Sequence, residues 1–110
     1  MKSMKDYCDN ETSRELKELG FPTKVTFIVE QDTIEIPINS GLVHLYEAQK
    51  WLREERGILL QPTYLELSDE WICVLRDKNK RQGYSAQKQK NYEEALSDGV
   101  KKAVKILKEE

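Results

Sequence analysis

The chain has 110 residues, of which 38% are hydrophobic and 35% charged, and a formal net charge of -2. The length fits one domain, the near-neutral charge excludes a histone-like nucleic-acid binder, and the apolar content is too high for a wholly disordered chain. No apolar run approaches the roughly 18 residues that a membrane span needs, and no apolar signal core follows the charged N-terminus. We therefore expect a soluble cytoplasmic protein that makes no membrane contact.

A short helix is predicted near the N-terminus. Thr12 and Glu15 have the spacing of a capping box, in which each side chain satisfies a backbone amide at the helix start. Gly20 supplies the left-handed position that ends many helices, and Phe21 can then fold back onto Leu16. So short a helix must be held by its packing.

Two alternating segments follow and predict a β-hairpin. Residues 24–30 and residues 33–38 both place apolar side chains at every second position, and Gln31 and Asp32 are predicted to form the turn. Pro37 cannot donate to a ladder, so the second strand is expected at a sheet edge or at a bulge. The carboxylates around this turn, which we expect to be solvated rather than to hold a cation, are Glu30, Asp32 and Glu35.

A second helix and a second pair of strands repeat this layout. Apolar residues recur at helical spacing over residues 43–56, and Gly57 ends the pattern. Two extended segments follow, residues 58–67 and residues 70–76. The second of them is apolar on both faces, which is typical of a central strand.

A third helix is predicted from a capping pair, Asn91 and Glu94, to about Leu107. Gly99 lies in the middle of this helix, where glycine costs about 1 kcal/mol relative to alanine. A close approach of the helix to the sheet would justify a glycine at this position.

The predicted elements have the order α-β-β-α-β-β-α, which is two helix-hairpin units and a closing helix. We expect an α+β fold in which one mainly antiparallel four-stranded sheet packs with the helices. Residues 1–11 are polar and without periodicity. The expected organisation is therefore a loosely ordered segment over residues 1–11 and a single α+β domain over residues 12–110.

The counts of cysteine and histidine limit the chemistry. Cys8 and Cys73 are far apart in sequence and lack Cys-x-x-Cys spacing, so a disulfide framework is not expected. We expect an exposed thiol at Cys8, which lies in a polar stretch, and a buried thiol at Cys73, which lies in an apolar run. His44 has no cluster of metal-ligating residues near it in sequence, so it is expected to cap or line a helix start. We expect no metal and no cofactor.

Charge is distributed unevenly along the chain. Residues 1–75 carry a net charge of -6 and residues 91–110 a net charge of -1, whereas residues 76–90 carry +5 from six basic residues and one aspartate. We expect residues 76–90 to form a long basic loop between the last strand and the last helix. A loop of this length without structure of its own tends to be functional or disordered.

Two interpretations of the basic loop stay open. In one, its basic residues contact a nucleic-acid backbone while its tyrosine stacks on a base. In the other, the loop is a solvated connection that its charges keep soluble. The candidate nucleic-acid-binding residues are Arg76, Lys78, Lys80, Arg81, Tyr84, Lys88 and Lys90.

The chain lacks the sequence motifs of common enzymes. None of its five glycines belongs to a Gly-x-x-x-x-Gly-Lys or Gly-x-Gly-x-x-Gly motif, and no Gly-x-Ser-x-Gly motif occurs. The Glu-x-Lys at residues 15–17 lies on a predicted helix rather than at a strand end, where metal-dependent nucleases need it. We expect no enzymatic activity and no catalytic residues.

The segment ELKELGF (residues 15–21), followed by strands and by IEIP (residues 34–37), resembles small toxins of the HicA type. That resemblance implies a fold like the double-stranded-RNA-binding domain and cleavage of mRNA by a histidine in a Gly-x-Ser-His motif on a middle strand. The corresponding stretch here, residues 27–33, has no histidine. We therefore do not expect ribonuclease activity by that mechanism.

A broader resemblance joins ELKELGF with two later segments, AQKWLREERGI (residues 48–58) and YEEALSDGV with Ala103 (residues 92–103). In this order they are similar to small uncharacterised proteins that are common in phages and mobile elements of gut bacteria. Those proteins have no assigned activity, so the resemblance implies a fold and no catalytic residues.

The leading hypothesis is a non-enzymatic accessory protein of the phage or mobile-element type that acts through protein-protein contact. Its partner is unknown, and a second copy of the chain is one candidate. Trp51 and Trp71 are expected in the core, with an interface as the alternative for either. Nucleic-acid binding through residues 76–90 is the alternative function, and a degenerate toxin-like RNA enzyme ranks third.

Overall fold

The computed structural model describes residues 7–22, 24–37 and 42–109, and of residues 24–27, 29 and 35–37 it describes the backbone alone. These ranges hold three helices and five strands. They are α1 (Asn10–Glu18), β1 (Lys24–Val29), β2 (Asp32–Pro37), α2 (Leu45–Glu55), β3 (Ile58–Leu65), β4 (Glu70–Asp77), β5 (Gln82–Ser85) and α3 (Tyr92–Lys108). The α+β class predicted from the sequence is confirmed.

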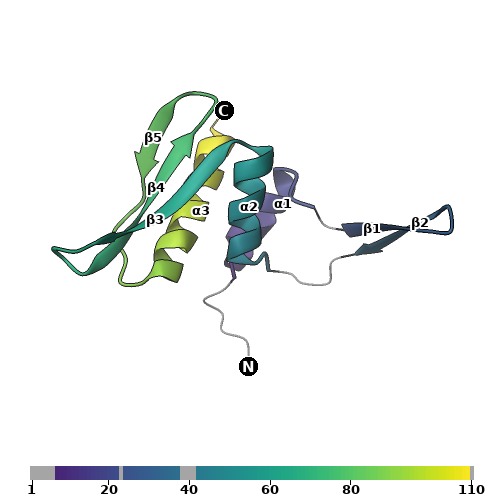
Figure 1. Cartoon of the computed structure of the whole chain (residues 1–110), viewed down its shortest axis with the longest axis horizontal. Coiled ribbons are helices and arrows are strands. Elements are labelled where there is room, and N and C mark those ends of the chain that lie inside the picture. The colour runs from purple at the N-terminus through teal and green to yellow at the C-terminus, as the bar shows by residue number, and fades with distance from the viewer. Residues whose placement is uncertain (1–6, 23, 38–41, 110) are drawn as a thin grey trace.

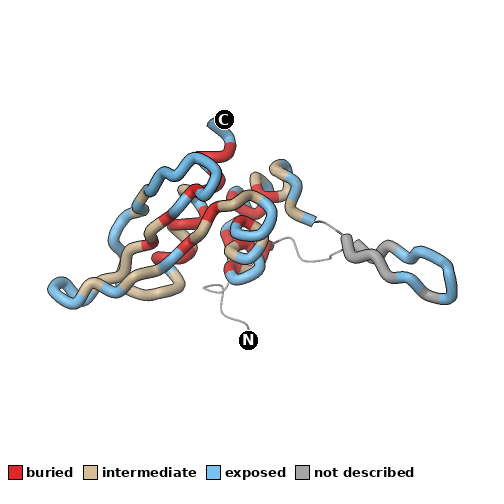
Figure 2. The backbone as a smooth tube through the Cα atoms, turned by 45° about the horizontal axis from the view of Figure 1, so that its top comes forward, coloured by how far each residue is buried: buried red, intermediate tan, exposed pale blue. Residues whose placement is uncertain are grey.

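The larger sheet and the helices form the main body. The strands have the order β3-β4-β5 and are antiparallel, so the segment that is apolar on both faces is central, as predicted. The helices α2 and α3 pack on one face of this sheet, and α1 packs against α3 (Figure 1). The buried positions gather between the sheet and the helices (Figure 2). The buried sheet residues, all on this helix face, are Ile58, Leu60, Cys73, Leu75 and Asp77.

The helix α3 lies close to the sheet at Gly99. A Cβ atom added to this glycine would overlap the Sγ atom of Cys73 on β4. The expected reason for a glycine in mid-helix is therefore confirmed. At the start of the helix, the Asn91 side chain accepts from the Glu94 amide at 2.8 Å, as the capping pair predicted.

The helix α1 starts earlier than predicted. Asp9 is its N-cap and accepts from the Thr12 amide at 2.7 Å, whereas Thr12 itself is buried inside the helix. Both residues can cap a helix, and burial of Thr12 decides which one does. The predicted helix end is confirmed, because Gly20 has a φ of 112° and the Phe21 amide donates to the Leu16 carbonyl at 3.0 Å.

Cys8 is buried, which corrects the expectation of an exposed thiol. Its amide donates to the Val43 carbonyl at 2.7 Å, and its carbonyl accepts from the Ser13 hydroxyl at 3.4 Å. The same hydroxyl oxygen accepts from the Val43 amide at 2.9 Å. These bonds tie the residues before α1 to the start of α2. Of the segment 1–11, residues 1–6 lie outside the described residues.

His44 caps α2, as predicted. Its Nδ1 atom accepts from the Tyr46 amide at 3.2 Å, and its ring centroid lies 5.3 Å from that of Tyr7 and 5.4 Å from that of Tyr46. Gly57 follows the helix with a φ of 70°, and its carbonyl accepts from the Lys78 amide at 2.9 Å. The end of α2 is thereby linked to the end of β4.

The strands β1 and β2 form a separate two-stranded sheet, so the expected single four-stranded sheet is not observed. The hairpin extends away from the helices along the long axis of the molecule, which measures 57 Å (Figure 1). Its register pairs Val29 with Asp32 and places Glu30 and Gln31 in the turn, one position earlier than predicted. Residue 38, the predicted end of the second strand, lies outside the described residues.

The edges of the larger sheet explain why the hairpin does not join it. At the β3 edge, the Gln49 side chain of α2 donates to the Leu60 carbonyl at 2.9 Å. Pro62 on the same strand lacks an amide donor. The other edge is β5, which is only four residues long. Short and covered edges disfavour the addition of further strands.

The segment 76–90 is not one long loop, which corrects the expectation from its composition. Its residues 82–85 form β5, in which Tyr84 pairs with Leu75 and Gly83 with Arg76. Further along, Trp71 and Gln89 exchange two backbone hydrogen bonds of 2.7 Å each. The segment therefore lies alongside β4 because β4, a central strand, has backbone groups to satisfy on both sides.

The two tryptophans are half-buried and have aromatic partners within the fold. The ring centroid of Trp51 lies 5.7 Å from that of Phe21. The ring centroid of Trp71 lies 5.3 Å from that of Tyr64 and 5.4 Å from that of Tyr92. Edge-on and tilted contacts of this kind stabilise a fold beyond the area that they bury.

Candidate interaction surfaces

The turn between β4 and β5 is held by Asp77. This buried carboxylate accepts from the Asn79 amide at 3.0 Å and from the Lys80 amide at 3.3 Å. Arg81 ends the turn with a φ of 54°. Because one carboxylate holds two turn amides, the basic side chains of this turn project from a defined backbone.

Three of the predicted nucleic-acid-binding residues meet on the open face, the face of the larger sheet opposite the helices. Arg76, Lys78 and Arg81 are exposed and line a hollow of about 590 Å³ together with Leu59. Among the described residues, the acid that lines this hollow is Asp77, whose carboxylate already binds the turn. We call Arg76, Lys78 and Arg81 the basic surface, which can attract a phosphate or a carboxylate.

Lys80 and Tyr84 border a different hollow, beside α3, with Lys102 and Lys105. The Tyr84 ring packs against the core, and its hydroxyl donates to the Gln82 side chain at 2.6 Å. Tyr84, which was a candidate from the sequence to stack on a base, therefore packs β5 against the core.

Lys88 and Lys90 lie apart from both hollows. They are exposed and flank Gln89, which pairs with Trp71 near the start of β4. Arg76 lies near the other end of the same strand. The fold therefore divides the seven predicted residues among three places.

Apolar side chains border the basic surface on the open face. Leu59 is the cross-strand partner of Arg76, and Val74 and Ile72 precede Arg76 at alternate positions along β4. All three apolar side chains are half-buried, and within the described part of the chain no residue on this face is buried. We call Leu59, Ile72 and Val74 the apolar strip.

The tip of the β1–β2 hairpin has the opposite charge. Glu30 and Asp32 are exposed there, and two large apolar side chains accompany them, with Ile28 80% exposed and Ile34 45% exposed. We call these four residues the acidic tip. Figure 2 shows the exposed tip at the far end of the hairpin. In the sequence, a signal of this surface was Ile28, an apolar residue at a position where the alternation places polar ones.

The backbone register gives the hairpin one face with many apolar positions. Val25 pairs with Ile36 and Phe27 with Ile34, so these four positions lie on the same side of the hairpin. Neither strand makes an extensive contact with any other described element. A two-stranded hairpin by itself is marginally stable in water.

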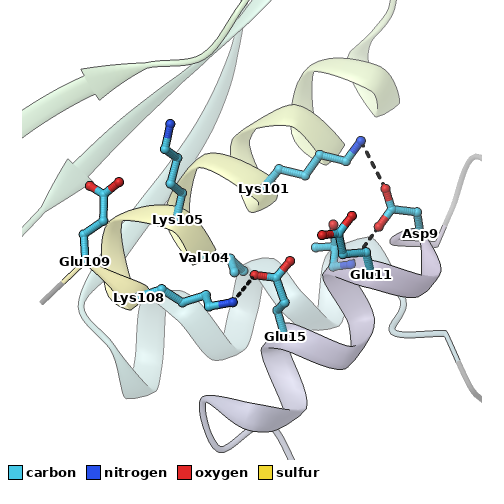
Figure 3. A pocket seen from close by; sticks show the side chains of 9 residues that line it. Asp9, Glu11, Glu15, Lys101, Val104, Lys105, Lys108 and Glu109 are labelled. Atoms are coloured by element: carbon cyan, nitrogen blue, oxygen red, sulfur yellow. Dashed lines mark hydrogen bonds and ion pairs between the residues drawn. The ribbon is translucent and has the colours of Figure 1, made fainter.

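A further hollow lies between α1 and α3, where the charges are already matched (Figure 3). Lys101 contacts Asp9 at 3.2 Å, and Lys108 contacts Glu15 at 2.7 Å. Hydrogen bonds from Thr12, aided by Lys101, hold the pKa of Asp9 below its usual value. The hydrogen bond to Glu15 raises the pKa of Lys108. We interpret these pairs as contacts that hold α1 on α3.

The two thiols are structural. Burial raises the pKa of Cys8 to about 12 and that of Cys73 to about 11. A reactive cysteine needs a lowered pKa and access to solvent. Over the ranges that the structure describes, no three metal-ligating side chains group together and no helix is long and apolar enough to cross a membrane.

Comparisons of the chain with models of protein families, with curated proteins and with solved structures find no match. No activity or partner can therefore be transferred from a relative. What bears on function is the set of surfaces on the molecule itself, namely the acidic tip, the basic surface and the apolar strip.

Proposed function

We propose that this protein acts without catalysis, as a cytoplasmic accessory protein of the phage or mobile-element type that binds a protein partner through the β1–β2 hairpin. The observation that carries the proposal is the exposure of Ile28 and Ile34 at the tip of a hairpin that extends away from the fold. Burying one such side chain fully contributes about 1.5–3 kcal/mol. The two isoleucines lie on opposite faces of the hairpin, so each face has an exposed apolar side chain that favours association.

The backbone of the hairpin supports the same function. In the described sheet, β1 and β2 have each other as their one strand neighbour, so each has a second edge open to another chain. A partner segment can add to such an edge through main-chain hydrogen bonds while its side chains meet the apolar positions. An edge strand presents a row of unpaired amides and carbonyls, which is a template for pairing with another chain.

The test places a photo-crosslinking amino acid at position 34. The matched control carries it at position 67, because Leu67 is fully exposed on the β3–β4 turn and lies outside the hairpin. We expect a discrete cross-linked adduct from position 34 in extract of host cells, identified by mass spectrometry. Excess unlabelled protein should compete for this adduct, and excess Ile28→Ser/Ile34→Ser protein should not.

Absence of an adduct from position 34 would contradict the proposal. So would adducts of the same size and yield from both positions, because these would report exposure rather than a binding surface. Circular dichroism of each labelled protein, compared with the unlabelled chain, checks that the substitution leaves the fold intact.

A second candidate function is binding to a nucleic-acid backbone through the basic surface. The observation that favours it is the convergence of Arg76, Lys78 and Arg81 on one hollow of the open face. Each phosphate contact that is lost should lower the slope of log affinity against log salt by about 0.7–0.9. Titration of a 20-nucleotide single strand and a 20-base-pair duplex with wild-type and Lys78→Ala/Arg81→Ala protein measures this slope.

The matched control for this titration is Lys88→Ala/Lys90→Ala, which removes the same charge from the same segment but away from the hollow. Equal losses from both variants would indicate non-specific attraction. No binding by the wild-type protein at about 50 mM salt would dismiss this candidate.

A further inference from the structure

The acidic tip and the basic surface have complementary features. The tip combines two carboxylates, Glu30 and Asp32, with exposed isoleucines. The open face combines three cations with the apolar strip, and Leu59 belongs to both the strip and the hollow that the cations line. Each surface thus has an apolar part beside a charged part, and the charges have opposite sign.

We propose that the partner of the hairpin is a second copy of this chain, and that the hairpin of one copy docks on the open face of the other. This inference rests on the proposed function and names its partner. The carboxylates of the acidic tip meet Arg76, Lys78 and Arg81, while the face of the hairpin that carries Ile34 covers Leu59, Ile72 and Val74. Complementary charges of this kind fix the register of an interface and suppress wrong partners.

The arrangement of the molecule makes this contact intermolecular. The hairpin lies at one end of the long axis and the larger sheet at the other, with α2 and α3 between them (Figure 1). The helices cover the face of the sheet that is turned toward the hairpin. The open face is turned away, so the hairpin of the same copy does not reach it.

A two-fold arrangement satisfies both surfaces of both copies. In a pair that runs in opposite directions, the hairpin of each copy lies at the end of the other copy that carries the open face, where it can bend across that face. Such a reciprocal pair makes the same contact twice and closes, whereas a head-to-tail arrangement would continue into larger particles. We therefore expect a dimer.

Charge reversal tests the contact from both sides. Glu30→Lys/Asp32→Lys makes the tip basic, and Lys78→Glu/Arg81→Glu makes the open face acidic. Each variant alone then juxtaposes like charges in both contacts of the dimer. We expect the dimer dissociation constant, measured by light scattering and sedimentation over a concentration series, to rise by about tenfold or more in each variant.

The decisive measurement mixes the two variants. In the mixture, a basic tip meets an acidic face in one contact, and an acidic tip meets a basic face in the other, so charge is matched in both. We expect a heterodimer to form from two proteins that are separately monomeric. This restoration also shows that neither variant has lost its fold.

Two control variants carry the same changes in charge elsewhere. Lys88→Glu/Lys90→Glu reverses two cations outside the basic surface, and Glu47→Lys/Glu54→Lys reverses two exposed acids on α2. We expect both to keep the wild-type dissociation constant within about twofold, because long-range attraction between exposed charges is largely screened near 0.15 M salt.

The remaining outcomes decide between this inference and its alternatives. A wild-type chain that stays monomeric, with a position-34 adduct to a different protein, would overturn self-association and leave the proposed function standing. The absence of an adduct from position 34 would contradict both self-association and the proposed function. Nucleic acid that co-purifies with a monomer and is lost in Lys78→Glu/Arg81→Glu would assign the open face to nucleic acid instead. Particles larger than a dimer that respond to the reversals would support the contact in a head-to-tail form.

Discussion

The two sheets of this molecule are both antiparallel and yet are stabilised in different ways. The β3–β4–β5 sheet has helices packed on one face, where Cys73 and Leu75 are fully buried. The β1–β2 hairpin has no comparable cover among the described elements, and its isoleucines at positions 28 and 34 are exposed. Local alternation is enough to specify a hairpin, whereas a stable sheet needs a second layer.

The turns of the two sheets also differ in the side-chain hydrogen bonds that stabilise them. In the larger sheet, the Asp77 carboxylate binds turn amides, and Asp69 at the β3–β4 turn accepts from the Tyr64 hydroxyl at 2.6 Å. Both sheets have left-handed turn residues where glycine and asparagine are preferred: Asp69 and Arg81, each with a φ of 54°, in the larger sheet, and Glu30 and Gln31, with φ values of 48° and 76°, in the hairpin. Left-handed residues without such preference cost about 1–2 kcal/mol each. In the larger sheet the side-chain bonds of the turns can offset this cost, whereas the hairpin carries it at two consecutive residues, where docking can offset it.

Truncation of one apolar side chain in each sheet should change the free energy of unfolding most strongly, and by different amounts in the two sheets. Leu75→Ala leaves a cavity in the core and should lower the free energy of unfolding by about 2–5 kcal/mol. Ile34→Ala should change it by less than about 0.5 kcal/mol when the protein is monomeric, because little is buried there. Urea denaturation at low protein concentration measures both. A loss at Ile34 as large as that at Leu75 would show that the hairpin is packed in solution.

A second comparison uses two glycines. Gly99→Ala adds a Cβ atom that overlaps Cys73, and overpacking of this kind costs about 1–3 kcal/mol, less the roughly 1 kcal/mol gained in helix propensity. Gly83→Ala on β5 meets only ordinary contact with a backbone oxygen at 3.8 Å. We expect the midpoint of thermal denaturation to be lower than that of the wild-type protein for Gly99→Ala and unchanged for Gly83→Ala. Equal midpoints would mean that α3 and β4 adjust to admit the methyl group.

A third change removes a helix cap in the main body. Asp9→Ala should lower the free energy of unfolding at pH 7 by about 1 kcal/mol, because the Thr12 amide loses its acceptor. The folded pKa of Asp9 is lowered, so its contribution is complete above the ordinary carboxyl range and disappears as the pH falls through the folded value. The difference between wild-type and variant should therefore shrink in acid. If the difference in unfolding free energy between wild-type and Asp9→Ala protein stayed constant down to pH 2, the contribution of Asp9 could not depend on its ionised carboxylate.

The smallest effect is confined to the hairpin. Glu30→Asn/Gln31→Gly supplies the residues that a type I′ turn prefers, and should stabilise β1–β2 locally by about 1 kcal/mol. Amide hydrogen exchange should slow in β1 and β2 and stay unchanged in β4. Slower exchange in both sheets would mean that they open together, and the distinction drawn between them would fail.

The sequence predicted the boundaries of elements where one residue type has a strong local preference. Gly20 with Phe21, the His44 cap, the Asn91 cap and Gly57 each act within one turn of backbone, and the structure has them as expected. The start of α1 was missed because Asp9 and Thr12 are both good caps, and burial chose between them. Burial of Cys8 was missed because its neighbours in sequence are polar, while its contacts come from Ser13 and Val43.

The α+β class, the central position of β4 and the close approach of α3 at Gly99 could all be predicted before the fold was known, because periodicity and glycine report local constraints. Three features became evident from the folded chain: β5 pairs with β4, the hairpin stands apart, and the basic segment is split with Arg76, Lys78 and Arg81 on one face. Strand partners and surface clusters depend on residues far apart in the chain. Net charge and alternation do not encode which of those residues meet.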